Sequence, residues 1–284
     1  MSYDQACVGL RLHDTKPGTL AERVFYAKQQ GFQCCHLALS KTLGKDMIQA
    51  MPLTPGLACQ VKLDLDGFPV TVLGCYLNLA HPDEEVYRQT VRQYVAHLRL
   101  NQWLGAGMVG TETGNPNADY AYDPDRSHTE ESLELFIRRL EPVVRAAEKL
   151  GTMIAIEPVV RHIVSTPRRA RRVLDAIASP NLGIIFDPVN LIDSWNYEQL
   201  DELIQEAVEL LGEEIMTIHL KDFRIDAMGK VISTAAGTGQ MDYTRLLRFV
   251  RDKKPCIQMT LEDSKPENAE AARRHIEALY GFLA

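Results

Sequence analysis

Four polar side chains stand at the ends of short apolar runs in the second half of the chain. Glu157 follows the run 154–156, Asp187 follows 182–186, His219 lies near the end of 215–220, and Glu262 follows 256–261. Three carboxylates and one imidazole are ligands suited to Mn²⁺, Mg²⁺, Co²⁺ or Zn²⁺, with positions left open for substrate oxygens. The set contains no thiolate, which argues against a structural zinc site. We therefore predict one bound divalent metal ion, with Mn²⁺ as the first choice.

Such a site indicates a particular kind of carbonyl chemistry. A substrate with a carbonyl beside a hydroxyl can bind a metal through both oxygens, and the metal then stabilises the enediolate formed on proton loss. A carboxylate within hydrogen-bond reach can take the proton. Its return to the opposite face gives an epimer, and its return to the neighbouring carbon gives an isomer. Expulsion of a β-hydroxyl from the same enediolate gives dehydration.

The residues that must position this site follow one repeating pattern. Eight apolar runs, each typical of a strand buried on both faces, alternate with longer amphipathic segments. The runs are 6–12, 34–39, 70–79, 108–113, 153–159, 182–186, 215–220 and 256–261. The pattern predicts a single (β/α)8 TIM barrel over 1–284, with its site at the carboxyl ends of the strands. An open doubly wound sheet is the competing fold. That fold usually has a glycine-rich phosphate-binding turn after its first strand, and no such turn follows the first run here.

The segments between the runs carry helix start and stop signals. Helices are predicted over 19–30, 82–104, 127–150, 166–178, 197–211, 242–251 and 267–283. Ser127 and Glu130 have the spacing of a capping box, and Asp242 is placed to cap the seventh helix. Between the second and third runs, Pro52, Pro55 and Gly56 predict a short or irregular helix within 40–66.

Composition narrows the class of protein further. The formal net charge is −7, whereas nucleic-acid-binding proteins usually present a basic face. Six cysteines without a Cys-x-x-Cys pair favour free thiols and a cytoplasmic setting. No apolar stretch approaches the roughly 18 residues of a membrane span. We expect a small-molecule substrate, with neither a nucleic-acid nor a membrane partner, and leave open a homo-oligomer.

Other polar residues near predicted strand ends are candidates for substrate binding. Glu112 ends the fourth run, His81 follows the third, and His162 follows Glu157 by five residues. Lys221, two residues after His219, is placed to neutralise a developing oxyanion. Arg224 has a planar guanidinium group that can bind a carboxylate or phosphate through two hydrogen bonds.

Three further residues near the start of the chain could be either substrate contacts or structural residues. Arg11 and His13 follow the first run, where a substrate contact and a salt-bridged loop are equally compatible with the sequence. His36 lies inside the second run, and we interpret it as a core histidine.

Five motifs together give the chain a family resemblance. They are Ile156-Glu157-Pro158, Phe186-Asp187-Pro188-Val189-Asn190, Ile218-His219-Leu220-Lys221-Asp222, the stretch 237–243 and Leu261-Glu262. In this order they resemble the xylose isomerase-like TIM barrel superfamily. The resemblance implies that Glu157, Asp187, His219 and Glu262 bind the metal. It also implies that Glu157 and Glu262 are the catalytic proton-transfer pair.

The chain departs from that pattern in two places. Many relatives carry a histidine where this chain has Asn190, whose amide can hydrogen-bond a substrate hydroxyl but cannot shuttle a proton. In the ketose 3-epimerase branch a glutamate often stands where this chain has Ile163.

The resemblance and the residues together support a ranked set of functions. The leading hypothesis is a metal-dependent isomerase or epimerase acting on a small sugar or polyol-type keto compound through an enediolate. The alternative is a lyase of the inosose dehydratase type. An endonuclease IV-like abasic-site nuclease ranks lowest, because of the acidic charge and of Asn190. A catalytically inactive binding subunit is a further alternative, against which the intact set of metal ligands argues.

Overall fold

A closed barrel of parallel strands forms the centre of the protein. The computed structural model describes residues 5–44 and 52–283. The barrel strands are β1 (Cys7–Arg11), β2 (Cys35–Leu37), β3 (Val70–Gly74), β4 (Met108–Glu112), β5 (Ile154–Glu157), β6 (Leu182–Phe186), β7 (Ile215–Leu220) and β10 (Gln258–Leu261). They pair in the order β1-β10-β7-β6-β5-β4-β3-β2, so the eight predicted runs form one TIM barrel.

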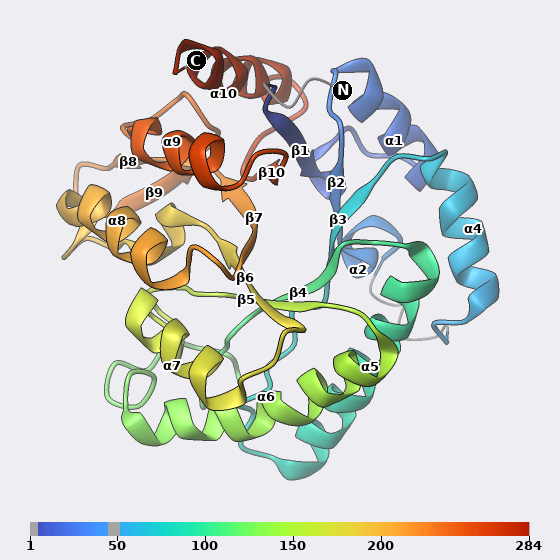
Figure 1. Cartoon of the computed structure of the whole chain (residues 1–284), viewed down its shortest axis with the longest axis vertical. Helices are drawn as coiled ribbons and strands as arrows, with labels where there is room; N and C mark the ends of the chain where they lie inside the picture. The colour runs from blue at the N-terminus through green and yellow to red at the C-terminus, as the bar shows by residue number, and fades with distance from the viewer. Residues whose placement is uncertain (1–4, 45–51, 284) are drawn as a thin grey trace.

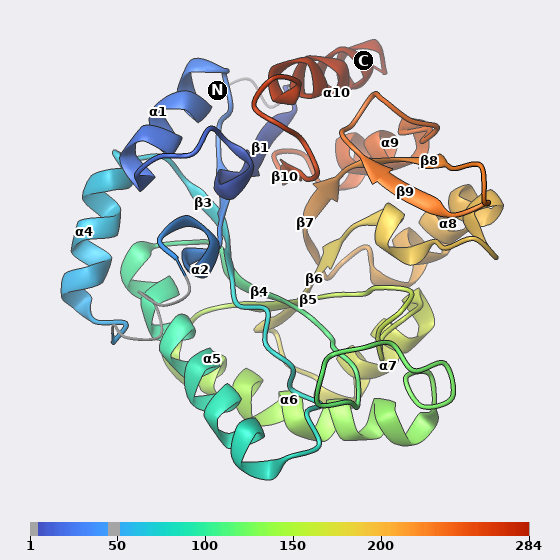
Figure 2. The ribbon, with the colours of Figure 1, turned by 180° about the vertical axis from the view of Figure 1, so that it is seen from behind.

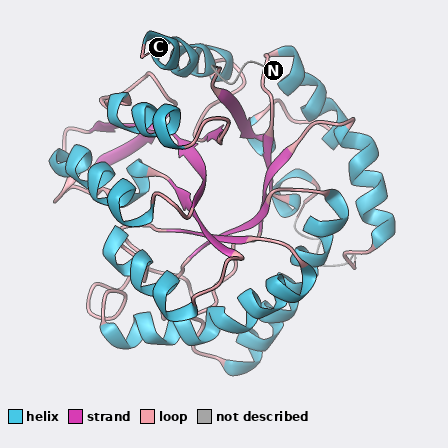
Figure 3. Ribbon diagram, viewed as in Figure 1, coloured by secondary structure: helices cyan, strands magenta, loops and turns pink. Residues whose placement is uncertain are grey.

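An outer ring of helices surrounds these strands (Figures 1 and 3). It consists of α1 (Leu20–Gln29), α4 (Pro55–Leu65), α5 (Glu84–Leu104), α6 (Glu130–Leu150), α7 (Pro167–Ile177), α8 (Leu200–Leu211), α9 (Thr244–Lys253) and α10 (Ala269–Phe282). Their buried apolar faces cover the outside of the barrel and form the main core with it. Among the described residues, no helix is both long and apolar enough to cross a membrane.

The inside of the barrel has its own small apolar cluster. Val72, Met108, Ala155 and Ile185 come from β3, β4, β5 and β6 and pack apart from the main core. A Cβ atom on Gly110 of β4 would lie 2.4 Å from Val72 Cγ1 and 2.7 Å from Ile185 Cδ1. Since β4 and β6 are not neighbours in the sheet, this contact crosses the barrel interior. The cluster fills the interior below the polar ends of the strands.

Several short elements shape the polar end of the barrel. Directly after β1 and β6 come the 3-10 turns η1 (Leu12–Asp14) and η2 (Pro188–Leu191), and η3 (Tyr197–Gln199) precedes α8. Beyond β2 lies α2 (Leu39–Thr42), and beyond β7 lies the antiparallel hairpin of β8 (Asp222–Ile225) and β9 (Val231–Thr234). In Figure 2, α2 and this hairpin lie on different sides of the barrel.

Three expectations about local structure were wrong. The segment predicted to be short or irregular contains the regular helix α4, because Pro55 occupies its first turn and Thr54 Oγ1 accepts from Leu57 N. Helix α6 begins at Glu130, and Thr129 rather than Ser127 caps it. Asp242 accepts from Thr244 N but precedes Tyr243, the N-cap residue of α9. The predicted residues 45–51 of the irregular segment lie outside the described residues.

Candidate active site

The predicted metal ligands come together at the carboxyl ends of four neighbouring strands. Glu157 ends β5, Asp187 directly follows β6, His219 lies in β7, and Glu262 directly follows β10. All four residues are buried, and one potential ligand atom of each lies within 4.8 Å of the others. These strands are adjacent in the order β10-β7-β6-β5, so their ends share one edge of the barrel.

Hydrogen bonds fix the orientation of these side chains. His219 Nδ1 lies 3.2 Å from both Glu157 Oε1 and Glu262 Oε1. Asn190 Nδ2 donates to Glu157 Oε1 at 2.7 Å. Asp187 Oδ1 accepts from the backbone N–H groups of Val189 and Asn190, at 2.9 and 3.2 Å. The turn η2 therefore holds both the Asp187 carboxylate and the Asn190 amide that supports Glu157.

The donor set fits a divalent cation. Two buried atoms, Asp187 Oδ2 and His219 Nε2, form no hydrogen bond, and the charged neighbour of Asp187 Oδ2 is Lys221 Nζ at 3.0 Å. Burial opposes a charge on His219, but Glu157 and Glu262 outweigh it and raise the pKa of His219 to about 9. For Asp187, burial is the dominant influence and raises its pKa to about 6, although Lys221 acts in the opposite direction. The three carboxylates thus create a strongly negative field that a metal ion would neutralise.

Lys221 provides a positive charge within the same site. Its Nζ donates to Asn190 Oδ1 at 2.6 Å and lies 3.0 Å from Asp187 Oδ2 and 3.3 Å from Glu262 Oε2. Burial alone would lower the pKa of Lys221, but these carboxylates raise it above its ordinary value. Lys221 directly follows β7, two residues after His219, and both side chains contact Glu262.

A polar cavity of about 280 Å³ opens above these groups. Five residues selected from the sequence line it: Glu112, Glu157, Asn190, Lys221 and Glu262. So do six residues whose role the sequence left open or missed: Arg11, His13, His36, Lys41, Tyr76 and Asp263. Its size suits a small polar substrate, since pockets for drug-sized ligands are about 300–1,000 Å³.

Three of the predicted substrate-binding residues lie outside this lining. His162 is adjacent to the cavity, with its Nδ1 3.9 Å from Glu112 Oε2. Arg224 is exposed and donates to the backbone oxygen of Thr238. His81 Nδ1 accepts from Asp83 N at the start of α5. Arg224 and His81 therefore form contacts away from the cavity, and their predicted place in the substrate site is wrong.

His36 is the clearest residue that sequence reasoning missed. It is buried in β2 as expected for a core histidine, but it also lines the cavity and stacks on His219, with ring centroids 5.4 Å apart. Its Nε2 lies 3.1 Å from the hydroxyl of Tyr76. The register of the sheet places it at this level, because His36 pairs with Arg11 at the polar end of β1.

Glu112 has an unusual environment for a carboxylic acid. Burial, followed by repulsion from Glu157 and Glu262, raises the pKa of Glu112 from 4.5 to about 7. It pairs in register with Glu157 on the neighbouring strand and accepts from the Tyr120 hydroxyl at 3.2 Å. In the metal-free protein, this pKa implies that Glu112 is partly protonated at neutral pH.

This shift predicts a pH-dependent difference between wild-type protein and Glu112→Gln. The pKa of Glu112 is 4.5 in the unfolded chain and about 7 in the folded protein, so its protonation stabilises the fold. This stabilisation is complete below pH 4.5 and is lost as the pH rises through about 7. From pH 5 to 8, the metal-free wild type should lose about 2 kcal/mol of unfolding free energy relative to Glu112→Gln. Denaturant unfolding of both proteins at each pH measures this, and parallel profiles would contradict the prediction.

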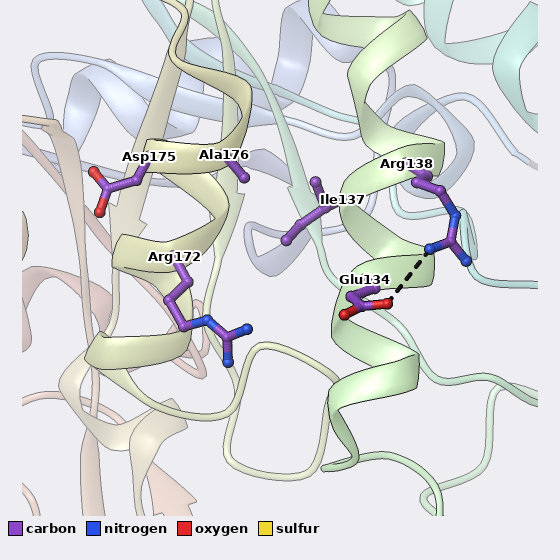
Figure 4. Close-up of a pocket in the computed structure, with 6 residues that line it drawn as sticks. All are labelled: Glu134, Ile137, Arg138, Arg172, Asp175 and Ala176. Carbon is purple, nitrogen blue, oxygen red and sulfur yellow. Dashed lines mark ion pairs between the residues drawn. The ribbon is translucent and has the colours of Figure 1, made fainter.

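A second hollow lies on the outer surface between α6 and α7 (Figure 4). Its volume is larger, about 520 Å³, and it is lined by Glu134, Ile137, Arg138, Arg172, Asp175 and Ala176. Glu134 and Arg138 form an exposed ion pair within α6 at 3.8 Å. None of the predicted metal-binding or substrate-binding residues lines this hollow. We therefore place the candidate active site at the ends of the strands.

The fold and the cluster of ligands define a TIM-barrel protein with a candidate metal centre at the carboxyl ends of its strands. The chain belongs to the xylose isomerase-like TIM barrel family, whose model matches residues 24–281. This confirms the resemblance found in the sequence motifs.

One curated relative shares a stretch of sequence with this chain. It is the 3-oxo-isoapionate decarboxylase of Pectobacterium atrosepticum, 34% identical over 104 residues. The match covers 35% of this chain and 36% of the relative, so it spans only about a third of that protein.

Solved structures of similar fold extend over almost the whole chain. The 3-keto-D-glucoside 4-epimerase YcjR from E. coli is 19% identical, with a TM-score of 0.70 over 97% of this chain and 99% of the other. The IOLI protein, solved with a zinc atom, is 16% identical, with a TM-score of 0.72 over 96% and 95%. The probable 3-DHS dehydratase AsbF from Bacillus anthracis is 14% identical, with a TM-score of 0.70 over 98% of both chains. At these identities the likeness concerns the fold.

Proposed function

We propose that this protein is a divalent-metal-dependent isomerase or epimerase of a small sugar or polyol-type keto compound. The observation that carries this proposal is the buried convergence of Glu157, Asp187, His219 and Glu262 beneath a small polar cavity. These four residues would hold the metal. Mn²⁺ is our first choice and Zn²⁺ the next, because the structurally similar IOLI protein binds zinc.

The roles of the protein's own residues follow from their positions. A bound cation would polarise the substrate carbonyl and lower the energy of negative charge on its oxygen. Glu157 and Glu262 come from β5 and β10, which β6 and β7 separate, and both contact His219 Nδ1. Two cavity-lining carboxylates on separate strands would serve as a pair of bases, one removing a proton and the other returning it.

Two further residues would support this proton transfer. Asn190 holds Glu157 Oε1 and leaves the other carboxylate oxygen available to a substrate proton. Lys221 carries a positive charge into the cavity wall, where it can offset charge developing on a substrate oxygen.

A lyase is the second candidate function. The same buried Lys221 would stabilise an enolate formed by loss of the α-proton, from which a β-hydroxyl is then expelled, or an enolate formed by loss of CO₂. Lyases also occur among similar proteins, since the curated relative is a decarboxylase and one structural neighbour is a probable dehydratase. We rank this candidate second, because the two separated glutamates favour removal and return of a proton.

The product formed in deuterated water distinguishes these candidates. The metal-loaded protein is incubated with a panel of ketoses and keto sugar acids, and products are analysed by mass spectrometry and NMR. An isomerase or epimerase yields a product of unchanged formula carrying one deuterium beside the carbonyl. A dehydratase product is lighter by one water, and a decarboxylase product by one CO₂. Phosphodiester hydrolysis that requires both glutamates would contradict the enolisation proposal.

A further inference from the structure

The positive charges deep in the cavity are already paired with carboxylates. Arg11 lies 2.7 Å from Asp14, 2.8 Å from Asp263 and 3.3 Å from Glu262. Lys221 is likewise surrounded by Asp187 and Glu262. Both charges are therefore largely offset by these carboxylates before a substrate binds.

Lys41 is different, because it lines the cavity and forms no ion pair with any carboxylate in the described part of the chain. It belongs to α2, its side chain is exposed, and its Nζ lies 6.0 Å from the centre of the Tyr76 ring. Within 5–44 and 52–283, no carboxylate forms an ion pair with Lys41. Its charge nevertheless reaches the cavity wall. Burial lowers the pKa of His13 to about 3, and the charges of Arg11 and Lys41 add to this effect.

Two histidines of the cavity wall, His13 and His36, have ring nitrogens that form no hydrogen bond, although Asp14 Oδ1 lies 3.8 Å from His13 Nε2. Both ring nitrogens of His13 are buried and form no hydrogen bond. His36 is 1% exposed, and its Nδ1 also has no partner, whereas its Nε2 lies beside the Tyr76 hydroxyl. The rings of His13 and His36 meet edge to face, with centroids 6.1 Å apart. Unpartnered buried polar atoms are costly in a folded protein, and a polar ligand would satisfy these.

We propose that Lys41, His13 and His36 form a subsite for a carboxylate of the substrate. This inference rests on the proposed function and narrows its substrate class to small keto sugar acids. Tyr76 and His36 connect the subsite to the metal ligands, since the His36 ring is 5.7 Å from Tyr76 and 5.4 Å from His219. A substrate with its carbonyl at the metal site thus has room to direct an acidic end toward Lys41.

The charge of the subsite favours a carboxylate over a phosphate monoester. Lys41 contributes a positive charge, whereas the charges of Arg11 and Lys221 are already offset by carboxylates. A phosphate monoester carries about −1.5 to −2 charges at neutral pH. Glu262 and Asp263 also line the cavity, so the additional negative charge would be repelled.

Binding of three matched four-carbon compounds to Mn²⁺-loaded protein tests this subsite. Isothermal titration calorimetry compares D-erythronate, erythritol and erythritol 4-phosphate. Wild-type protein should bind erythronate at least about tenfold more tightly than erythritol, as expected for a hydrogen bond to a charged group. Lys41→Met should remove this preference and Lys41→Arg should retain it. Neither change should alter Mn²⁺ affinity.

A second lysine provides the matched control. Lys16 is exposed and also lies over a tyrosine, with its Nζ 5.2 Å from the Tyr26 ring, but it does not line the cavity. Lys16→Met should leave the preference for erythronate intact. Thermal unfolding establishes that each variant is folded.

Several outcomes would overturn the subsite. They are equal affinity for erythronate and erythritol, a preference that survives in Lys41→Met, or tighter binding of the phosphate than of erythronate. These outcomes concern binding alone. If deuterium exchange into a keto substrate persists while they occur, the subsite fails and the proposed function stands. If erythronate binds as expected but no substrate exchanges deuterium, the proposed function fails.

Discussion

Glutamine in place of Glu157 or Glu262 is expected to reduce deuterium exchange into the substrate by roughly 10²–10⁴-fold, the usual contribution of a general acid or base. Glutamine keeps the size of the side chain and one carbonyl oxygen but cannot accept the substrate proton. Both residues lie 3.2 Å from His219 Nδ1, so each is close enough to the metal site to act on the same substrate. The measurement is the initial rate of exchange, followed by NMR under saturating metal.

The control for this experiment is a glutamate outside the cavity. Glu130 is exposed at the start of α6 and pairs with Arg172, so Glu130→Gln should exchange at the wild-type rate. The metal content of each variant is measured in parallel, because a loss of metal would also lower the rate. Wild-type exchange in both Glu157→Gln and Glu262→Gln, with metal bound, would falsify the assignment of the two bases.

Asparagine in place of Asp187 or His219 is expected to weaken metal binding by roughly 100-fold or more, since even residues that only orient metal ligands contribute 10–100-fold. Asp187→Asn should keep the hydrogen bonds from Val189 N and Asn190 N, because the asparagine oxygen can still accept them. The variant thus removes the charge of the ligand with little change in the turn η2. Equilibrium dialysis with Mn²⁺ or Zn²⁺ and elemental analysis measure the affinity.

Thermal and chemical stability give an independent measure of the same loss. Metal at one hundred times its dissociation constant should stabilise the wild type by about 2.7 kcal/mol. A 100-fold weaker variant should gain only about 0.4 kcal/mol at that concentration. His97→Asn is the matched control, because His97 is a buried histidine in α5 that bonds to Gln93 O at 2.8 Å. Full metal-dependent stabilisation of both ligand variants would rule out this metal centre.

Much of the site could be predicted because it lies at the ends of strands. Glu157, Asp187, His219 and Glu262 each stand beside a short apolar run, and in a barrel the carboxyl ends of all strands meet at one edge. Four residues spread over more than one hundred positions could therefore be placed together without coordinates. Lys221 could be added from its spacing to His219, because side chains two apart on a strand share a face.

The same reasoning could not place residues on the elements between the strands. Arg224 and His81 follow strands in sequence, but the β8–β9 hairpin and the entry to α5 direct their side chains elsewhere. Lys41 gave no signal at all, because it belongs to the four-residue helix α2 in a segment rich in breakers. The path of a loop depends on contacts with distant parts of the chain, and local sequence carries little of that information.

His36 illustrates both what the sequence could predict and what required the tertiary structure. The apolar run around it was sufficient to predict a buried strand, since every residue of β2 is buried. Burial on both faces removes the alternation that would have told which side chains point into the barrel and which toward the helices. The sequence by itself therefore determined the barrel, the four candidate metal ligands and the level of the barrel at which they meet. Only the tertiary structure decided that His36 lines the cavity beside His13 and Lys41, because that depends on how separate strands pack against one another.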